Sequence, residues 1–182
     1  MKICIYGSAN EAIDVSFRTA GEALGEELAS HGHTLIFGGG ASGMMGAVAR
    51  GFRKKGGEVI GISPEFFNVD GVLFEDCTKM IYTVDMRSRK QKLEDMADAF
   101  IVTPGGIGTM DEFFETISLN QLKIINKPII IFNTNGFYDN LISLLENSAD
   151  MHFLSHDDLD LYYATDNPKE IIKYLENNKI GD

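Results

Sequence analysis

Three short segments combine glycine with small polar residues, and each follows an apolar run. They are residues 7–10 (GSAN), 38–43 (GGGASG) and 103–109 (TPGGIGT). Glycine allows backbone amides to approach an anion, and the N-terminus of a following helix attracts negative charge. One such loop alone is more often a tight turn between a strand and a helix. Three together favour a pocket for a nucleotide or a sugar phosphate.

A carboxylate, Glu112, lies just beyond the third glycine segment. Because it stands three residues after Thr109, the pair matches a capping box, which would give Glu112 a purely structural role at a helix start. Glu115 and Ser118 follow at steps of three and are expected on the same helix face, toward the pocket. The apolar residues of this helix are expected to pack on a sheet. They are Phe113, Phe114, Ile117, Leu119 and Leu122.

Basic residues cluster upstream of this segment. They are Arg87, Arg89, Lys90 and Lys92. One interpretation is a solvated helix face, on which Lys90 pairs with Glu94. The other is that Asp85 caps the helix, so that Arg89 and Lys90 lie in its first turn, close to the strand ends. In that second interpretation one side of the helix is buried, through Met86, Leu93 and Met96. The residues alone leave both interpretations open.

The elements that would position these groups alternate along the chain. Strands are expected near 2–7, 34–38, 58–62, 79–84, 99–103, 128–133 and 161–164, and helices near 11–31, 44–55, 87–97, 109–125, 137–147 and 168–177. Most strands are continuous apolar runs, which is typical of strands covered on both faces. The pattern predicts one α/β domain over residues 1–182, a three-layer Rossmann-like fold with a mostly parallel sheet between helices. Ligands bind such sheets at the carboxyl ends of the strands. The segment 63–78 is expected to be a loop over the site.

Composition excludes several classes of function. The 182 residues carry 16 basic and 27 acidic side chains, a net charge of −11, which argues against nucleic acid or an anionic membrane as a partner. No apolar run approaches the roughly 18 residues that span a bilayer. Cys4 and Cys77 provide neither a disulfide framework nor a zinc site. We expect a cytoplasmic protein.

Familiar motifs for cofactors and hydrolysis are missing or misplaced. The residues Gly38, Gly40 and Gly43 match a dinucleotide fingerprint, but they follow the second strand and not the first, and no acidic residue ends the next strand. A P-loop and a Gly-x-Ser-x-Gly elbow are absent from the sequence. The four histidines lie away from the glycine segments and are expected at the surface or at helix ends. The sequence therefore predicts no metal and no cofactor.

Two longer segments resemble a known family. Residues 38–49 (GGGASGMMGAVA) are similar to its GGGxxGLMGxVA segment, and residues 86–90 (MRSRK) with 97–112 (ADAFIVTPGGIGTMDE) are similar to its MHxRK and ADAFIxLPGGxGTxxE segments. The family is LONELY GUY (LOG), the cytokinin riboside 5′-monophosphate phosphoribohydrolases, long labelled lysine decarboxylases. The resemblance covers residues 2–145. It implies hydrolysis of the N-glycosidic bond of a nucleoside 5′-monophosphate, with release of free base and ribose 5-phosphate.

The resemblance also assigns residues to roles. Arg89 and Glu112 match the catalytic pair of the family. Its phosphate-binding segment is matched by Gly105, Gly106, Gly108 and Thr109. Further substrate-pocket positions are matched by Ser8, Gly40, Met44, Lys90 and Ser118. The expected ligand is a small nucleoside monophosphate, and the expected assembly is a homodimer, as is common in the family.

The sequence departs from the family pattern at several positions, and a second function is also compatible with it. Arg87 replaces a histidine, Leu93 a methionine and Ser118 a threonine, which leaves the preferred base open. The decarboxylase label finds no support, because no histidine is followed by lysine in the Ser-x-His-Lys pattern of pyridoxal enzymes. The alternative function is a molybdenum cofactor carrier or another nucleotide carrier of related fold. A carrier needs the phosphate cradle but not the Arg89–Glu112 pair.

Overall fold

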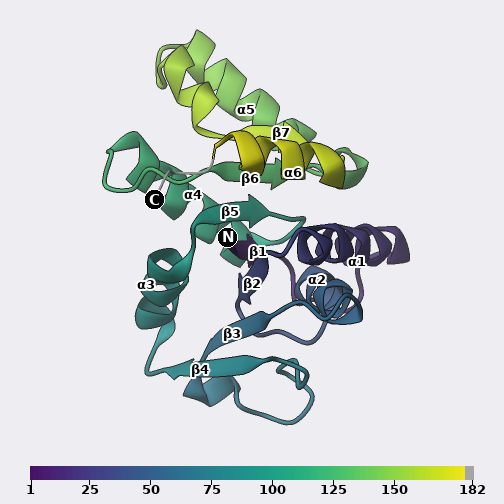
Figure 1. Cartoon of the computed structure of the whole chain (residues 1–182). Coiled ribbons are helices and arrows are strands. Elements are labelled where there is room, and N and C mark those ends of the chain that lie inside the picture. The colour runs from purple at the N-terminus through teal and green to yellow at the C-terminus, as the bar shows by residue number, and fades with distance from the viewer. Residues whose placement is uncertain (179–182) are drawn as a thin grey trace.

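A computed structural model describes residues 1–178 of the chain (Figure 1). Its centre is one sheet of seven strands, ordered β4-β3-β2-β1-β5-β6-β7, in which every neighbouring pair is parallel. The strands are β1 (Lys2–Tyr6), β2 (Thr34–Phe37), β3 (Val59–Pro64), β4 (Lys79–Thr83), β5 (Ala99–Val102), β6 (Ile129–Phe132) and β7 (Tyr163–Thr165). The central strands are buried along almost their whole length, as expected of parallel strands covered on both faces.

Helices cover both faces of the sheet, which confirms the predicted three-layer Rossmann-like arrangement (Figure 1). One apolar core lies under α1 (Val15–Ser30), α2 (Gly43–Lys54) and α6 (Pro168–Asn177). The other lies under α3 (Met86–Met96), α4 (Ile107–Gln121) and α5 (Asp139–Asp150). Three short 3-10 helices complete the described elements: η1 (Glu65–Phe67), η2 (Thr134–Gly136) and η3 (His156–Leu161).

The strand order places the glycine segments at one edge. From β1 the chain moves outward through β2, β3 and β4, then returns to the other side of β1 at β5. The loops after β1 and β5 therefore leave the sheet side by side and diverge toward opposite halves of it. This reversal of strand order is where α/β sheets open a crevice for ligands. A backbone hydrogen bond from Ser8 N to Pro104 O, at 3.1 Å, joins the two loops.

All seven predicted strands are present, but some boundaries and exposures differ from the predictions. Helix α1 begins at Val15 and not at residue 11, because the Asp14 side chain caps it by accepting from Ser16 N. His33, two residues beyond the C-cap of α1, is buried and only 6% exposed, although the histidines were expected at the surface or at helix ends. Within residues 63–78, Ser63 and Pro64 still belong to β3, and η1 follows. No helix in the described chain is long and apolar enough to cross a membrane.

A buried tyrosine anchors the third glycine segment. Tyr138 precedes α5 and has no solvent exposure, and its hydroxyl donates to the carbonyl of Thr103 at 2.8 Å. The hydroxyl of Thr103 in turn donates to Tyr6 O at 2.8 Å. These bonds hold the chain just before the Pro104-Gly105-Gly106 turn against β1. The position of the turn is therefore set by the core and not by solvent-exposed contacts.

We expect Tyr138→Phe to lower the free energy of unfolding by about 1–2 kcal/mol, because the variant leaves the Thr103 carbonyl without its buried donor. Urea denaturation should show a lower midpoint with an unchanged slope. Tyr82→Phe is the matched control, since Tyr82 is 44% exposed and its bond to Asn68 lies at the surface. Equal effects of the two variants would contradict the anchoring role of Tyr138.

Candidate active site

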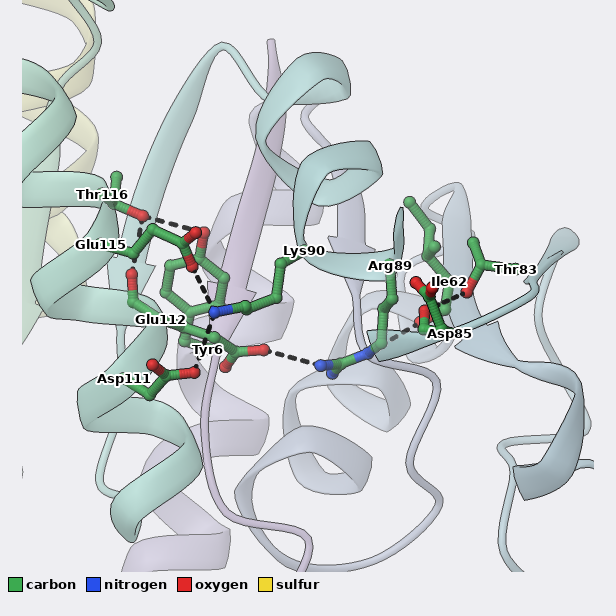
Figure 2. Close-up of polar contacts among 10 residues, drawn as sticks. All are labelled: Tyr6, Ile62, Thr83, Asp85, Arg89, Lys90, Asp111, Glu112, Glu115 and Thr116. Carbon is green, nitrogen blue, oxygen red and sulfur yellow. Dashed lines mark hydrogen bonds and ion pairs between the residues drawn. The ribbon is translucent and has the colours of Figure 1, made fainter. Parts of the chain in front are cut away.

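A buried ion pair joins α3 to α4 at the carboxyl edge of the sheet. Arg89 Nη1 donates to Glu112 Oε1 at 2.9 Å, and the two side chains are only 10% and 11% exposed (Figure 2). Arg89 Nε also donates to Ile62 O at 3.3 Å, which ties the guanidinium to the end of β3. Burying both charges is costly unless they pair and their remaining polar atoms are satisfied. The structure provides the pairing and one further acceptor, Ile62 O, with residues from three separate elements.

Local sequence explains why Arg89 reaches this position. The Asp85 side chain accepts from Ser88 N at 2.8 Å and starts α3, as the second interpretation of the basic cluster predicted. Arg89 then lies in the first turn, pointing toward the strand ends. Gly38, at the end of β2, leaves room for it, because a Cβ there would collide with the guanidinium of Arg89. Burial of α3 is less complete than predicted, since Leu93 is buried but Met86 is 41% exposed.

Glu112 is not a capping residue, so the capping-box interpretation is wrong. Helix α4 starts at Ile107, with Gly106 as its N-cap and no side-chain hydrogen bond to the first turn. Thr109 and Glu112 thus lie inside the helix. One turn further on, the hydroxyl of Thr116 donates to Glu112 O and lies 3.1 Å from the hydroxyl of Tyr6 on β1 (Figure 2). These contacts seat α4 on the sheet and leave the Glu112 carboxylate free for Arg89.

The environment of Glu112 acts on its protonation in two directions. Burial raises the pKa of this carboxyl above its ordinary value, and the charge and hydrogen bond of Arg89 offset only part of that rise. Arg89 therefore counteracts part of the desolvation penalty and favours the ionised form. An anionic carboxylate within a dry wall is suited to stabilise positive charge that develops on a bound molecule.

A pocket of 230 Å³ opens beside the ion pair. Seven of the predicted site residues line it: Ser8, Arg89, Lys90, Gly106, Gly108, Thr109 and Glu112. The amides at the uncapped start of α4 lie along this wall, where a helix N-terminus favours an anion. Five further lining residues were not predicted as site residues: Gly7, Ala9, Met45, Met86 and Asp111. Their types are unremarkable in the sequence, and only their place beside the loops reveals them.

Four predicted residues are not in the lining of this pocket. Met44 is fully buried beneath it, and Gly40 and Gly105 shape the loops behind it. Ser118 lies in a separate apolar groove between α4 and η3, where its hydroxyl donates to Phe114 O. The expectation that Ser118 faces the pocket was wrong because three residues rotate a helix by about 300° and not a full turn.

The chain is similar to a known family over most of its length. A family profile described as "Possible lysine decarboxylase" matches residues 45–175. Cytokinin riboside 5′-monophosphate phosphoribohydrolase LOG3 of Arabidopsis thaliana is 33% identical over 96% of this chain and 81% of its own length. The corresponding LOG protein of Oryza sativa subsp. japonica is 33% identical over 96% of this chain and 72% of its own. The chain belongs to the LOG family.

Solved structures extend the likeness in fold beyond LOG proteins. The molybdenum cofactor binding protein of Rippkaea orientalis superposes with a TM-score of 0.73, covering 97% of this chain and 95% of that one, at 23% identity. That identity supports a common fold and nothing finer. The profile's decarboxylase description names a reaction for which this LOG-family sequence offers no Schiff-base lysine motif. Within the described residues, no cluster of three His, Cys, Asp or Glu side chains is placed to hold a metal.

Beside the Arg89–Glu112 pair, Lys90 makes contacts that the sequence did not predict. Its Nζ lies 3.1 Å from Asp111 Oδ2 and 2.6 Å from Glu115 Oε2, so its ion pairs join α3 to α4 (Figure 2). The predicted partner, Glu94, is one turn along α3 and makes no ion pair with Lys90 in the described chain. Burial, and then the charge of Glu115, raises the pKa of Glu94 to about 7.

The raised pKa of Glu94 gives a signed dependence of stability on pH. Between the ordinary value of 4.5 and about 7 the folded chain binds more protons at this residue than the unfolded chain. This contribution to stability therefore falls as pH rises through that window. We expect Glu94→Gln to remove this pH-dependent contribution. The free energy of unfolding of the variant should therefore rise relative to that of the wild type from pH 5 to pH 8. Urea titrations at several pH values measure the difference.

Glu75→Gln, at an exposed carboxylate, is the control for this titration. A wild-type-minus-Glu94→Gln difference that stays constant with pH would show that burial does not hold Glu94 protonated.

Proposed function

We propose that this LOG-family protein hydrolyses the N-glycosidic bond of an adenine-type nucleoside 5′-monophosphate. The products are free base and ribose 5-phosphate. The observation that carries the proposal is the buried Arg89–Glu112 pair, set in the wall of a pocket that the uncapped start of α4 also lines. The names of relatives that share about a third of its residues support the same reaction. We further propose that residues 1–182 form a single catalytic domain.

Each wall of the pocket has a role in this proposal. The amides at the start of α4, from Gly106 to Thr109, bind the 5′-phosphate, where the helix dipole favours negative charge. Ser8 approaches from the loop after β1, which a backbone bond joins to the loop after β5. Phosphate binding places the sugar over the ion pair. The binding energy of this remote group then supports the reaction at C1′.

The bond that breaks joins C1′ of the ribose to a ring nitrogen of the base. As it breaks, the electron pair leaves with the base and positive charge builds on the sugar ring. The ionised Glu112 carboxylate stabilises that charge from the pocket wall. Water adds its oxygen to C1′; one of its protons stays on the new hydroxyl and the other ends on the leaving base. Arg89 favours the ionised form of Glu112 and orients the nucleotide.

Base release tests this proposal directly. Purified protein is incubated with AMP and with isopentenyladenosine 5′-monophosphate, and free base is followed by chromatography. We expect Glu112→Gln and Arg89→Met each to lower kcat by about 10²- to 10⁴-fold, because each removes a group that acts at the reacting centre. Glu112→Gln keeps the shape of the side chain and so isolates the charge.

Two control variants accompany these measurements. Arg87→Met removes an exposed arginine from the same helix, and Glu146→Gln removes an exposed carboxylate from α5; both should retain wild-type rates. Near-full turnover by Glu112→Gln would refute the electrostatic role of the carboxylate. Tight binding of a nucleotide or pterin without any release of base would favour the carrier function, which rests on the likeness of fold alone.

We also propose that the protein is a homodimer. The pocket volume of 230 Å³ lies below the roughly 300–1,000 Å³ that usually encloses a small ligand, so a second copy would complete the enclosure. Apolar side chains are exposed along α4 and just after it, with Phe114 at 39%, Leu122 at 67% and Ile124 at 65% exposure. The cytoplasmic location stays a prediction from the sequence.

Light scattering after gel filtration tests the dimer, with an expected mass of about twice 20.1 kDa. Leu122→Glu should shift the mass to that of one chain while circular dichroism stays unchanged, because a charge cannot be buried at an apolar interface. Lys173→Glu, on α6, serves as a control for a surface charge change. A monomeric wild type, or a dimer that Leu122→Glu leaves intact, would contradict this interface.

A further inference from the structure

Arg89 and Lys90 are consecutive in α3, yet their contacts with α4 differ in kind. Arg89 meets Glu112 inside the pocket, at 10% and 11% side-chain exposure. Lys90 meets Asp111 and Glu115 at the rim, where these carboxylates are 59% and 39% exposed (Figure 2). Asp111 and Glu115 are four residues apart, so they lie one above the other on the same helix face. Lys90 therefore holds two successive turns of α4, with Glu112 between them.

The charges around Lys90 argue against a role in binding phosphate. One ammonium group faces two carboxylates, which leaves the immediate surroundings with a net negative charge. A phosphate placed there would meet two like charges and would have to displace an existing ion pair. The contact with Glu115 also raises the pKa of Lys90, which keeps the ammonium charged for its carboxylate partners. The uncapped amides of α4 offer an anion site without this repulsion.

The Arg89–Glu112 contact is the one that a substrate must share or replace. If Arg89 orients a nucleotide and Glu112 faces its sugar, the ion pair between the two side chains will weaken. A second link between the helices is then needed to keep the two groups at a working separation. The two ion pairs of Lys90 lie at the more exposed rim, away from the buried Arg89–Glu112 contact, and can persist throughout the reaction.

We propose that Lys90 is a positioning residue which, by bridging Asp111 and Glu115, sets α4 and its Glu112 relative to α3 and its Arg89. The proposal rests on the proposed function, because it names what keeps that catalytic pair aligned. It also assigns Lys90 a role other than the substrate contact implied by its family resemblance. Lys90 acts through Glu112 and does not touch the nucleotide.

Kinetics of matched variants separate positioning from phosphate binding. Lys90→Met removes the bridge from one side, and the double variant Asp111→Asn/Glu115→Gln removes it from the other while keeping the lysine. We expect both to lower kcat with AMP by about tenfold to a hundredfold, with KM changed by less than about threefold, because misplacement of a catalytic group affects the chemical step. Lys90→Arg should recover most of kcat. The affinity for inorganic phosphate should not change.

Lys92→Met is the control, since it removes an exposed lysine from the same helix. A rise in KM of about tenfold or more for Lys90→Met with kcat unchanged, together with weaker binding of inorganic phosphate, would make Lys90 a ligand and overturn the proposal. Wild-type kinetics in the Asp111→Asn/Glu115→Gln variant would also overturn it. Should Lys90→Met fail to fold, that double variant and Lys90→Arg still decide the question.

If the proposed function is wrong, the wild-type protein will release no base from either nucleotide, and this result is distinct from those of the Lys90 variants. The bridge itself is then tested by a thermodynamic cycle of Lys90→Met, Glu115→Gln and the combined variant, read from urea midpoints. Effects that fail to add support a direct link between the helices. Strictly additive effects overturn it, whatever reaction the protein catalyses.

Discussion

The architecture around the site depends on one constraint, the burial of a guanidinium and a carboxylate side by side. Arg89 and Glu112 come from helices on either side of the pocket, and neither charge would be stable there alone. The pair therefore requires a capped start of α3, a side-chain-free position at Gly38 and a helix α4 that is seated on β1 through Thr116. Each of these features is local, but the ion pair makes them interdependent.

An acidic protein needs a local source of attraction if it is to hold a phosphate. The chain has a net charge of −11, and Lys90, a cation in the pocket lining, is surrounded by carboxylates. The attraction for an anion must therefore come largely from backbone amides and from Arg89. The reversal of strand order between β1 and β5 supplies those amides at the start of α4, where no side chain occupies them. The same edge keeps them beside the ion pair.

Sequence reasoning anticipated the seven strands and the layers, since apolar runs depend on local chemistry, whereas Arg89 and Glu112 were named together only through the family resemblance. It failed where a long-range contact decided the outcome. Glu112 had the spacing of a cap, but α4 starts two residues before Thr109. Lys90 had a plausible partner one turn away in Glu94, yet Asp111 and Glu115 of another helix lie closer. Ser118 was placed toward the pocket from spacing and from the family resemblance, and Met45 was missed beside Met44.

These differences bear on how function divides among proteins that share this fold. A cofactor binding protein superposes on almost the whole chain, so the sheet and the glycine loops do not select between binding and hydrolysis. A carrier needs amides for an anion, which the end of any such sheet can supply. Hydrolysis needs, in addition, a carboxylate kept ionised in a dry wall and held at a constant distance from its partner. In the proposed mechanism Arg89 favours the ionised form of Glu112 and the neighbouring Lys90 maintains the distance, so two consecutive residues of α3 would supply what a carrier does not need.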